Sequence, residues 1–167
     1  MALDSRLTVR AQCTHTDALD LGTVTLPLDF NWTDRLRTGT GADQANMLWT
    51  DTRTIAASGD EDLDLAGVLV DAFGDTLTFA RIKGLIVAAA AGNTNDVEVS
   101  SDGSAGVPLF LALGDGITVR PGGVFAWFAP DATAVAVTAT TGDLINIANS
   151  SSGTSVTYDI VIIGASA

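Results

Sequence analysis

The start of the chain alternates between apolar and polar residues with a period of two. One side of the alternation consists of Leu7, Val9, Ala11, Cys13 and His15, and the other of Arg6, Thr8, Arg10, Gln12 and Thr14. Successive side chains of a strand point to opposite faces, so the pattern predicts a half-buried β-strand within the first 16 residues.

A second alternation follows, with Val24, Leu26, Leu28 and Phe30 on one face. Pro27 interrupts it, and a proline cannot donate a hydrogen bond to a sheet ladder. This run is therefore predicted to be an edge strand or an extended arm. Residues 33–46 read TDRLRTGTGADQAN, which predicts a loop with a helical turn running on to Trp49.

Beyond residue 50 the chain consists of short β-prone runs separated by turns. Gly-Asp dipeptides precede such runs at residues 59–60, 74–75, 114–115 and 142–143. Strands at this spacing, with no ten-residue helical pattern between them, indicate an antiparallel sandwich or barrel. Residues 65–73 also fit helical spacing, so a helix is the alternative there, although Gly67 and Gly74 disfavour it. The run at 156–163 is apolar on both faces, which predicts a central strand.

Composition and charge narrow the function classes. A net charge of −12 argues against nucleic acid and against anionic membrane surfaces. Charged residues make up 17% of the chain, against about 25% in a typical soluble domain. The surface is therefore expected to be covered by Thr, Ser and Gly or hidden against other subunits. The longest apolar run, residues 84–92, is shorter than the roughly 20 residues of a membrane span, and MALDSRLTVR contains no signal-peptide pattern.

The acidic cluster in SGDEDLDLAG raises the possibility of a calcium site. Asp60, Asp62, Asp64 and Asp71 occupy the first, third, fifth and twelfth positions of a calcium loop. Such a loop requires Gly at its sixth position and Glu at its twelfth, where this chain has Leu65 and Asp71. The alternation of acids and leucines is more typical of a strand, and no metal or other cofactor is predicted.

Two further groups of residues could carry chemistry. Cys13 and His15 share a strand face, but no partner is available to complete a nucleophilic site, so Cys13 is predicted to be a small buried hydrophobe. Four aromatic residues could form a sugar-stacking platform: Trp32, Trp49, Trp127 and Tyr158. Trp127 lies between Phe125 and Phe128 in an apolar run and is interpreted as core.

Charge is split along the chain. Residues 1–53 contain five arginines and seven acids, a net charge of −2, and residues 54–167 contain three basic residues and 13 acids, a net charge of −10. We interpret residues 1–50 as an N-terminal strand or arm segment and residues 51–167 as a β-sandwich domain. The arginines expected to make contacts with a neighbouring subunit or a larger shell are Arg6, Arg10, Arg35, Arg37 and Arg53.

The succession of strand and turn phrases at residues 52–87, 92–99, 117–132 and 141–164 resembles small all-β structural proteins of tailed bacteriophages. Typical phrases are ITVRPGGVFAWFAPDA and TGDLINIANSSSGTSVTYDIVIIG. Within that group the chain is most similar to capsid decoration, or cement, proteins.

The resemblance implies a jelly-roll-like antiparallel β-sandwich with an extended N-terminal segment. It also implies a homotrimer on the capsid surface of the virion, bound to the major capsid protein, made in the host cytoplasm and without enzymatic activity. Two alternatives stay open: a tail, baseplate or receptor-binding component, and a carbohydrate-binding β-sandwich module.

Overall fold

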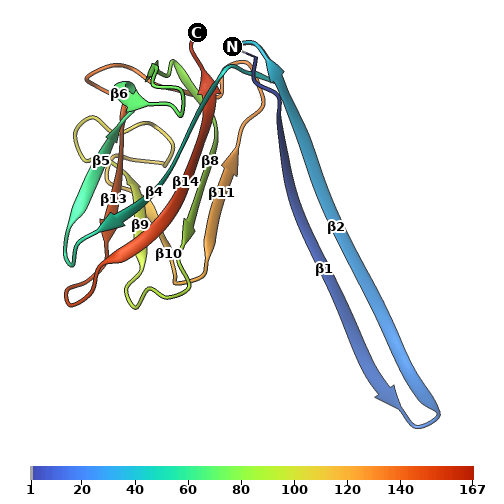
Figure 1. The fold of residues 1–167 in the computed structure, drawn as a ribbon. Coiled ribbons are helices and arrows are strands. Elements are labelled where there is room, and N and C mark those ends of the chain that lie inside the picture. The colour runs from blue at the N-terminus through green and yellow to red at the C-terminus, as the bar shows by residue number, and fades with distance from the viewer. Residues whose placement is uncertain (1) are drawn as a thin grey trace.

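The computed structural model describes residues 2–167, so the first residue of the expected arm segment lies outside it. Two long antiparallel strands, β1 (Ser5–Leu19) and β2 (Gly22–Thr38), form a hairpin that projects from the rest of the molecule (Figure 1). Their register is uninterrupted from the Ser5–Leu36 pair to the Leu19–Gly22 pair. We call this hairpin, residues 5–38, the arm.

The loop predicted from residue 33 is wrong for its first six residues, because β2 continues to Thr38. Residues 33–36 lack a run of apolar residues, but β1 supplies partners for each of them, and Thr8 and Thr33 also bond through their hydroxyls. The chain then forms the short strand β3 (Gln44–Ala45), parallel to β2. The expected helical turn before Trp49 is replaced by β4 (Met47–Ile55), so the predicted boundary after residue 50 lies inside a strand.

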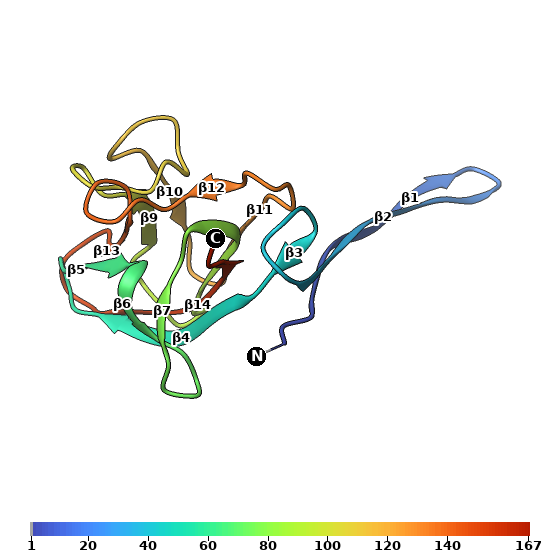
Figure 2. The ribbon, with the colours of Figure 1, turned by 90° about the horizontal axis from the view of Figure 1, so that it is seen from above.

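The body of the protein is an antiparallel β-sandwich, which confirms the predicted all-β class (Figures 1 and 2). One sheet has the order β11 (Val124–Phe128), β8 (Arg81–Ala89), β14 (Val156–Ala165) and β4, and β12 (Val135–Ala136) also pairs with β8. The other has the order β10 (Gly116–Val119), β9 (Val97–Ser101), β13 (Leu144–Asn149) and β5 (Asp60–Asp64). We call them the first and the second sheet.

The core lies between these two sheets and contains side chains from both. Leu85 and Ile160 come from the first sheet, Val99 and Ile147 from the second, and all four are buried. The predicted central position of residues 156–163 is confirmed, because β14 pairs with β4 on one side and with β8 on the other.

The helix considered for residues 65–73 is wrong. Residues 66–70 form strand β6 (Ala66–Val70), which pairs with β7 (Thr76–Thr78). Leu65 and Leu69 are buried whereas Val68 and Val70 are exposed, which is the period of a strand. Gly67 has a φ of 127°, a conformation outside helical geometry that glycine adopts without strain.

A second, smaller core joins the arm to the outer face of the first sheet. Leu7, Leu36, Ala45 and Ile163 are buried in it. Trp32 of β2 stacks on Phe128 of β11, with ring centroids 5.7 Å apart and an interplanar angle of 17°. The arm is thus fixed at its base, while the remainder of the hairpin extends beyond the body (Figure 2).

Candidate interaction surface

The two faces of the arm differ in chemistry because most cross-strand pairs combine residues of similar polarity. One face carries the pairs Val9–Trp32, Ala11–Phe30, Cys13–Leu28, His15–Leu26 and Asp17–Val24. The opposite face carries Thr8–Thr33, Arg10–Asn31, Gln12–Asp29, Thr14–Pro27 and Thr16–Thr25. The first face is apolar from the Val9–Trp32 pair to the Cys13–Leu28 pair, and the pairs named on the second face are polar except for Pro27.

Over most of its length, none of residues 2–167 covers the apolar face. Five of its large side chains are 42–65% exposed: Val9, Val24, Leu26, Leu28 and Phe30. Burying such a side chain completely contributes about 1.5–3 kcal/mol, so covering the exposed halves of five would contribute on the order of 6 kcal/mol per arm. An isolated two-stranded hairpin is only marginally stable in water. The arm therefore has the properties of a surface that is completed by another molecule.

Cys13 lies on this apolar face and is exposed, so the prediction of a buried cysteine is wrong. The alternation correctly placed Cys13 with Val9 and Ala11, but in the part of the chain that the structure describes no second layer packs on that part of the hairpin. His15 lies on the same face opposite Leu26 and is also exposed. Both residues are surface groups in the middle of the arm.

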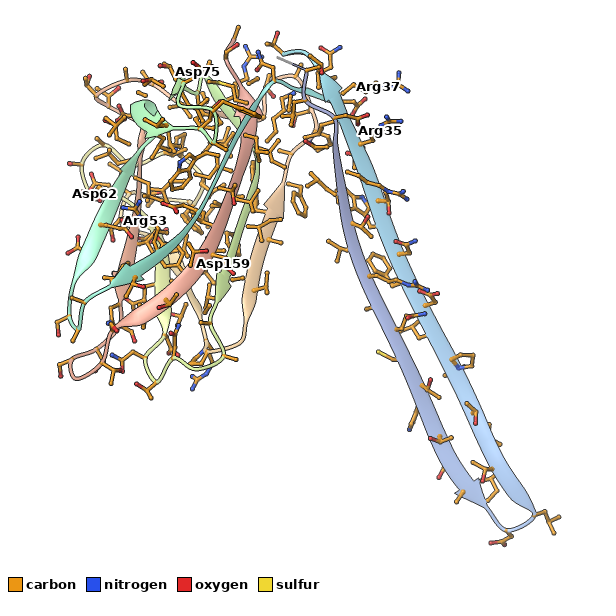
Figure 3. All side chains as sticks on the ribbon, viewed as in Figure 1. Arg35, Arg37, Arg53, Asp62, Asp75 and Asp159 are labelled. Carbon is orange, nitrogen blue, oxygen red and sulfur yellow. The ribbon has the colours of Figure 1, made fainter. Side chains whose placement is uncertain are left out.

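The five arginines expected at an interface lie in two places, and Figure 3 labels three of them, Arg35, Arg37 and Arg53. Arg6, Arg10, Arg35 and Arg37 belong to the arm, and Arg53 belongs to β4 in the body. The guanidinium of Arg10 donates to both oxygens of Asp29, at 3.1 and 2.7 Å, and that of Arg35 donates to Asp4. The pKa values of Asp29 and Asp4 are lowered, mainly by these hydrogen bonds. Exposed pairs of this kind contribute little stability, so here they mainly orient the side chains.

Arg53 has a different role, in a cluster at the edge of the core. Its Nε donates to Glu61 Oε2 at 2.7 Å, and one Nη donates to Asp51 at 3.0 Å. The hydroxyl of the buried Tyr158 donates to Glu61 Oε1 at 2.8 Å. Burial and the neighbouring Glu61 raise the pKa of Tyr158 well above its ordinary value. This cluster stabilises the sandwich, so Arg53 is not part of a common surface with the arm arginines.

Lys83 is buried and connects the base of the arm to the body. Its ammonium group donates to the backbone carbonyls of Gly41 and Asp131, the second at 3.0 Å. Burial is the main cause of the lowered pKa of Lys83. Because Gly41 lies in the segment between β2 and β3, this contact helps to fix the direction in which the arm leaves the body.

The acidic residues of the calcium hypothesis lie on and after β5, and Leu63 and Leu65 are buried, which confirms the predicted strand. Asp60 and Asp62 both accept hydrogen bonds from the side-chain amide of Asn146, at 3.0 and 2.9 Å. Asp64 accepts from the backbone of Ala66, and Asp71 accepts from the backbone of Phe73 and Asp75. Within residues 2–167 no group of three or more His, Cys, Asp or Glu side chains is placed to hold a metal ion.

The four aromatic residues of the sugar-binding hypothesis do not share a surface. Trp49 and Tyr158 are buried in the main core, and Trp127 packs against it, as its apolar surroundings predicted. Trp32 stacks on Phe128 at the base of the arm. Their positions therefore correspond to packing and not to a stacking platform.

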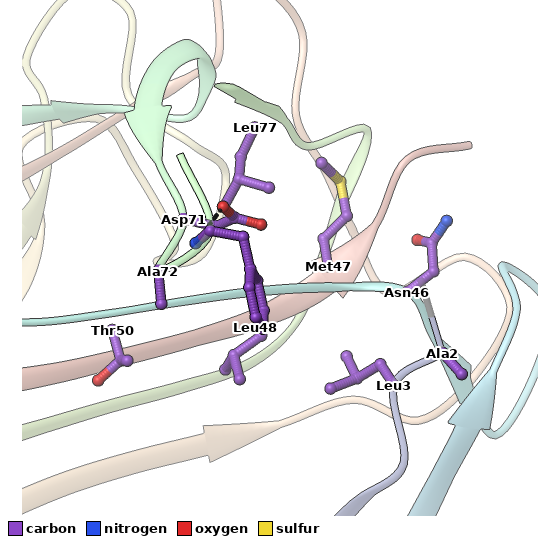
Figure 4. Close-up of a pocket in the computed structure, with 10 residues that line it drawn as sticks. Ala2, Leu3, Asn46, Met47, Leu48, Thr50, Asp71, Ala72 and Leu77 are labelled. Carbon is purple, nitrogen blue, oxygen red and sulfur yellow. Dashed lines mark hydrogen bonds between the residues drawn. The ribbon is translucent and has the colours of Figure 1, made fainter. Parts of the chain in front are cut away.

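A cavity of about 300 Å³ lies beside the base of the arm (Figure 4). Its walls come from the start of the chain, from β4, from the turn between β6 and β7 and from β7 itself. They include Leu3, Met47, Leu48, Phe73 and Leu77. Among the described residues 2–167, Asp71 is the one ionisable residue in its lining, and that carboxylate accepts the backbone hydrogen bonds described above. The described lining is therefore mainly apolar and does not place a nucleophile next to a base.

No helix among residues 2–167 is long and apolar enough to cross a membrane. Comparisons of the chain with known protein families, with curated proteins and with solved structures find no significant match.

Proposed function

We propose that this protein is a non-enzymatic structural component of a tailed-bacteriophage virion. In this proposal it decorates and stabilises the outside of the capsid as a homotrimer bound to the major capsid protein. The observation that carries the proposal is the arm: a hairpin with an uncovered apolar face, fixed at its base to a compact sandwich. Such a segment extends the reach of a small protein to a neighbouring subunit.

The connectivity of the body supports the resemblance on which the virion assignment rests. The sheet orders β11-β8-β14-β4 and β10-β9-β13-β5 mean that the chain changes sheet at each step between these eight strands, except from β9 to β10. Such alternation between the two sheets supports the proposal of a jelly-roll-like body, an architecture that occurs in viral capsid proteins. Fold alone does not determine function, so this support is by analogy.

The chemistry of the described residues agrees with a structural role. Exposed ionisable groups take part in ion pairs and in turns. Arg10 pairs with Asp29, and the carboxylate of Asp102 accepts hydrogen bonds from the backbone of Ser104 and Ala105. A negatively charged body with a hydrophobic arm fits a protein that binds other proteins, and it fits poorly with binding to nucleic acid.

The location is tested by electron microscopy of virions labelled with gold-conjugated antibodies against this protein. We expect gold over the whole head surface. Gold confined to the tail or baseplate would replace the capsid role by the alternative of a tail or receptor-binding component, and unlabelled virions would reject a virion role altogether.

The contribution of the arm is tested by a variant in which residues 11–30 are replaced by Asn-Gly, a sequence that favours a two-residue hairpin turn. The base contacts of Leu7, Trp32 and Leu36 remain in this variant. We expect it to unfold cooperatively like the parent but to bind neither capsids nor other copies. A shortened protein that still binds capsids with unchanged affinity would contradict the role of the arm.

A further inference from the structure

The body has a partly exposed apolar surface of its own, on the outer face of the first sheet. Ile86 of β8 and Val161 of β14 alternate with buried core residues and therefore point outward. In the register they form one row with Ala126 of β11, and Val124 and Ala88 occupy the next row. Val124 is 63% exposed and Ala126 is also exposed. We call these five residues the sheet patch. We call the apolar side of the arm, from the Val9–Trp32 pair to the Cys13–Leu28 pair, the arm face.

Within one chain the arm face and the outer face of the first sheet already meet at one place. Trp32, the cross-strand partner of Val9 in the arm, stacks on Phe128. Phe128 belongs to the row of the first sheet next to the row formed by Ala126, Ile86 and Val161. Gly84 lies beneath Phe128, and a Cβ at that position would be 3.3 Å from its ring. The two surfaces are therefore complementary in the part where a single chain brings them together.

That contact ends after Trp32 because the arm leaves the body (Figures 1 and 2). Beyond this point Phe30 and Leu28 are 54% and 59% exposed. In the sheet patch Val124 and Ala126 are exposed, whereas Ile86, Ala88 and Val161 are half-buried. One chain thus carries two apolar surfaces that match in character but do not cover each other beyond the arm base.

Charge favours the arm as the segment that approaches a second copy. Residues 5–38 contain four arginines and four aspartates, which sum to zero. Residues 39–167 contain four basic residues and 15 acids, a net charge of −11. Two such bodies repel each other, whereas a neutral arm can approach an acidic body without this cost. Asp159 is the one acid in the two rows of the sheet patch, at the margin of the patch beside Ala88.

Dimensions also agree. A strand of 15 residues is about 50 Å long, and the nine residues of β8 extend over about 30 Å, so an arm can cross the whole sheet.

We propose that the arm face of one copy packs on the sheet patch of a second copy, beside the base of that copy's own arm. Each copy then gives an arm and receives one, and a head-to-tail contact of this kind forms a closed ring when the rotation between copies closes. This inference rests on the self-association in the proposed function, but it does not depend on the location in a virion.

Cys13 provides the test, because it is the single cysteine of the chain and lies in the arm face. Chains carrying A126C together with C13S are mixed with wild-type chains, refolded together and treated with a short bismaleimide. In this mixture a link between the sheet patch and an arm can form only between different chains. We expect heterodimers of one chain of each type as the main crosslinked product.

The matched control moves the thiol to the polar face of the arm by combining Q12C with C13S. Gln12 lies next to Cys13 on β1 but points to the opposite side. We expect at least a tenfold lower yield of crosslinks to A126C chains from this variant. Equal yields from both faces, or wild-type chains linked only to each other through Cys13, would overturn the proposed docking.

Light scattering of the untreated wild-type protein separates the two hypotheses. An oligomer without crosslinks to A126C would reject docking on the sheet patch while leaving self-association intact. A stable monomer at micromolar concentration would reject both.

Discussion

Tyr158 offers a sharp test of the sandwich core, because it is the only tyrosine of the chain and its side chain is buried. Its hydroxyl donates to Glu61 Oε1 at 2.8 Å, and Arg53 holds the other oxygen of the same carboxylate. Burial and the negative charge of Glu61 raise the pKa of this hydroxyl well above its ordinary value of 10.0. We therefore expect the tyrosine to ionise only when the protein unfolds.

The sign of the pH dependence follows from proton counting. Above about pH 10 the unfolded chain loses the tyrosine proton and the folded protein keeps it, so the free energy of unfolding falls as pH rises. One proton corresponds to about 1.4 kcal/mol per pH unit, so between pH 10 and pH 11.5 wild type should lose about 2 kcal/mol through Tyr158. At neutral pH, Y158F should be less stable by about 1.5–3 kcal/mol, the usual contribution of a hydrogen bond to a charged group. The two proteins should therefore become nearly equal in stability near pH 11.5.

The measurement is urea unfolding of wild type and Y158F at several pH values between 7 and 11.5. The lowered pKa of Lys83 changes the stability of both proteins in the same way, so the difference between them isolates Tyr158. Absorbance of tyrosinate in the native protein gives an independent reading. A native titration near pH 10, or a stability difference that does not change with pH, would refute the placement of Tyr158 against Glu61.

Three further predictions concern the arm, a turn and the backbone. L28D should dissociate the oligomer in light scattering without changing the stability of the body, whereas T14D, on the polar face, should leave assembly unchanged. The carboxylate of Asp102 accepts hydrogen bonds from Ser104 and Ala105, which hold its pKa at about 2. The stabilising effect of this carboxylate is therefore present above about pH 4 and lost as the pH falls toward 2. Acid unfolding of D102N should show a weaker pH dependence in that window. G164A would place a Cβ 2.2 Å from the carbonyl oxygen of Arg81 and 2.6 Å from the Phe79 ring, so calorimetry should show a stability loss of about 1–3 kcal/mol. The control G92A has free space around its new Cβ and should change stability by less than about 0.5 kcal/mol.

Period-two alternation predicted β1, β5 and the outer part of β2. Apolar and polar residues alternate along a strand wherever its two faces differ in polarity. The alternation did not reveal that the apolar face of the arm lacks a cover, since Cys13 and Leu28 have the same spacing whether or not a layer packs on them. The strand at residues 33–38 was missed because its pairing depends on β1, which lies about 30 residues earlier in the chain. The site itself combines Trp32 and Phe128, which are 96 positions apart, and only the folded arrangement brings them together.

The position of β14 between β4 and β8 has a consequence for biosynthesis. In the first sheet β4 pairs with β14 alone, although more than 100 residues separate the starts of these two strands. The arm therefore leaves the ribosome long before the sheet that carries it can close, and its base cannot be fixed until Ile163 of β14 is in place. A chain that stops before β14 has a hydrophobic hairpin with no firm attachment, which makes it a target for chaperones and proteases. Only a complete body can hold the arm in the direction that assembly requires.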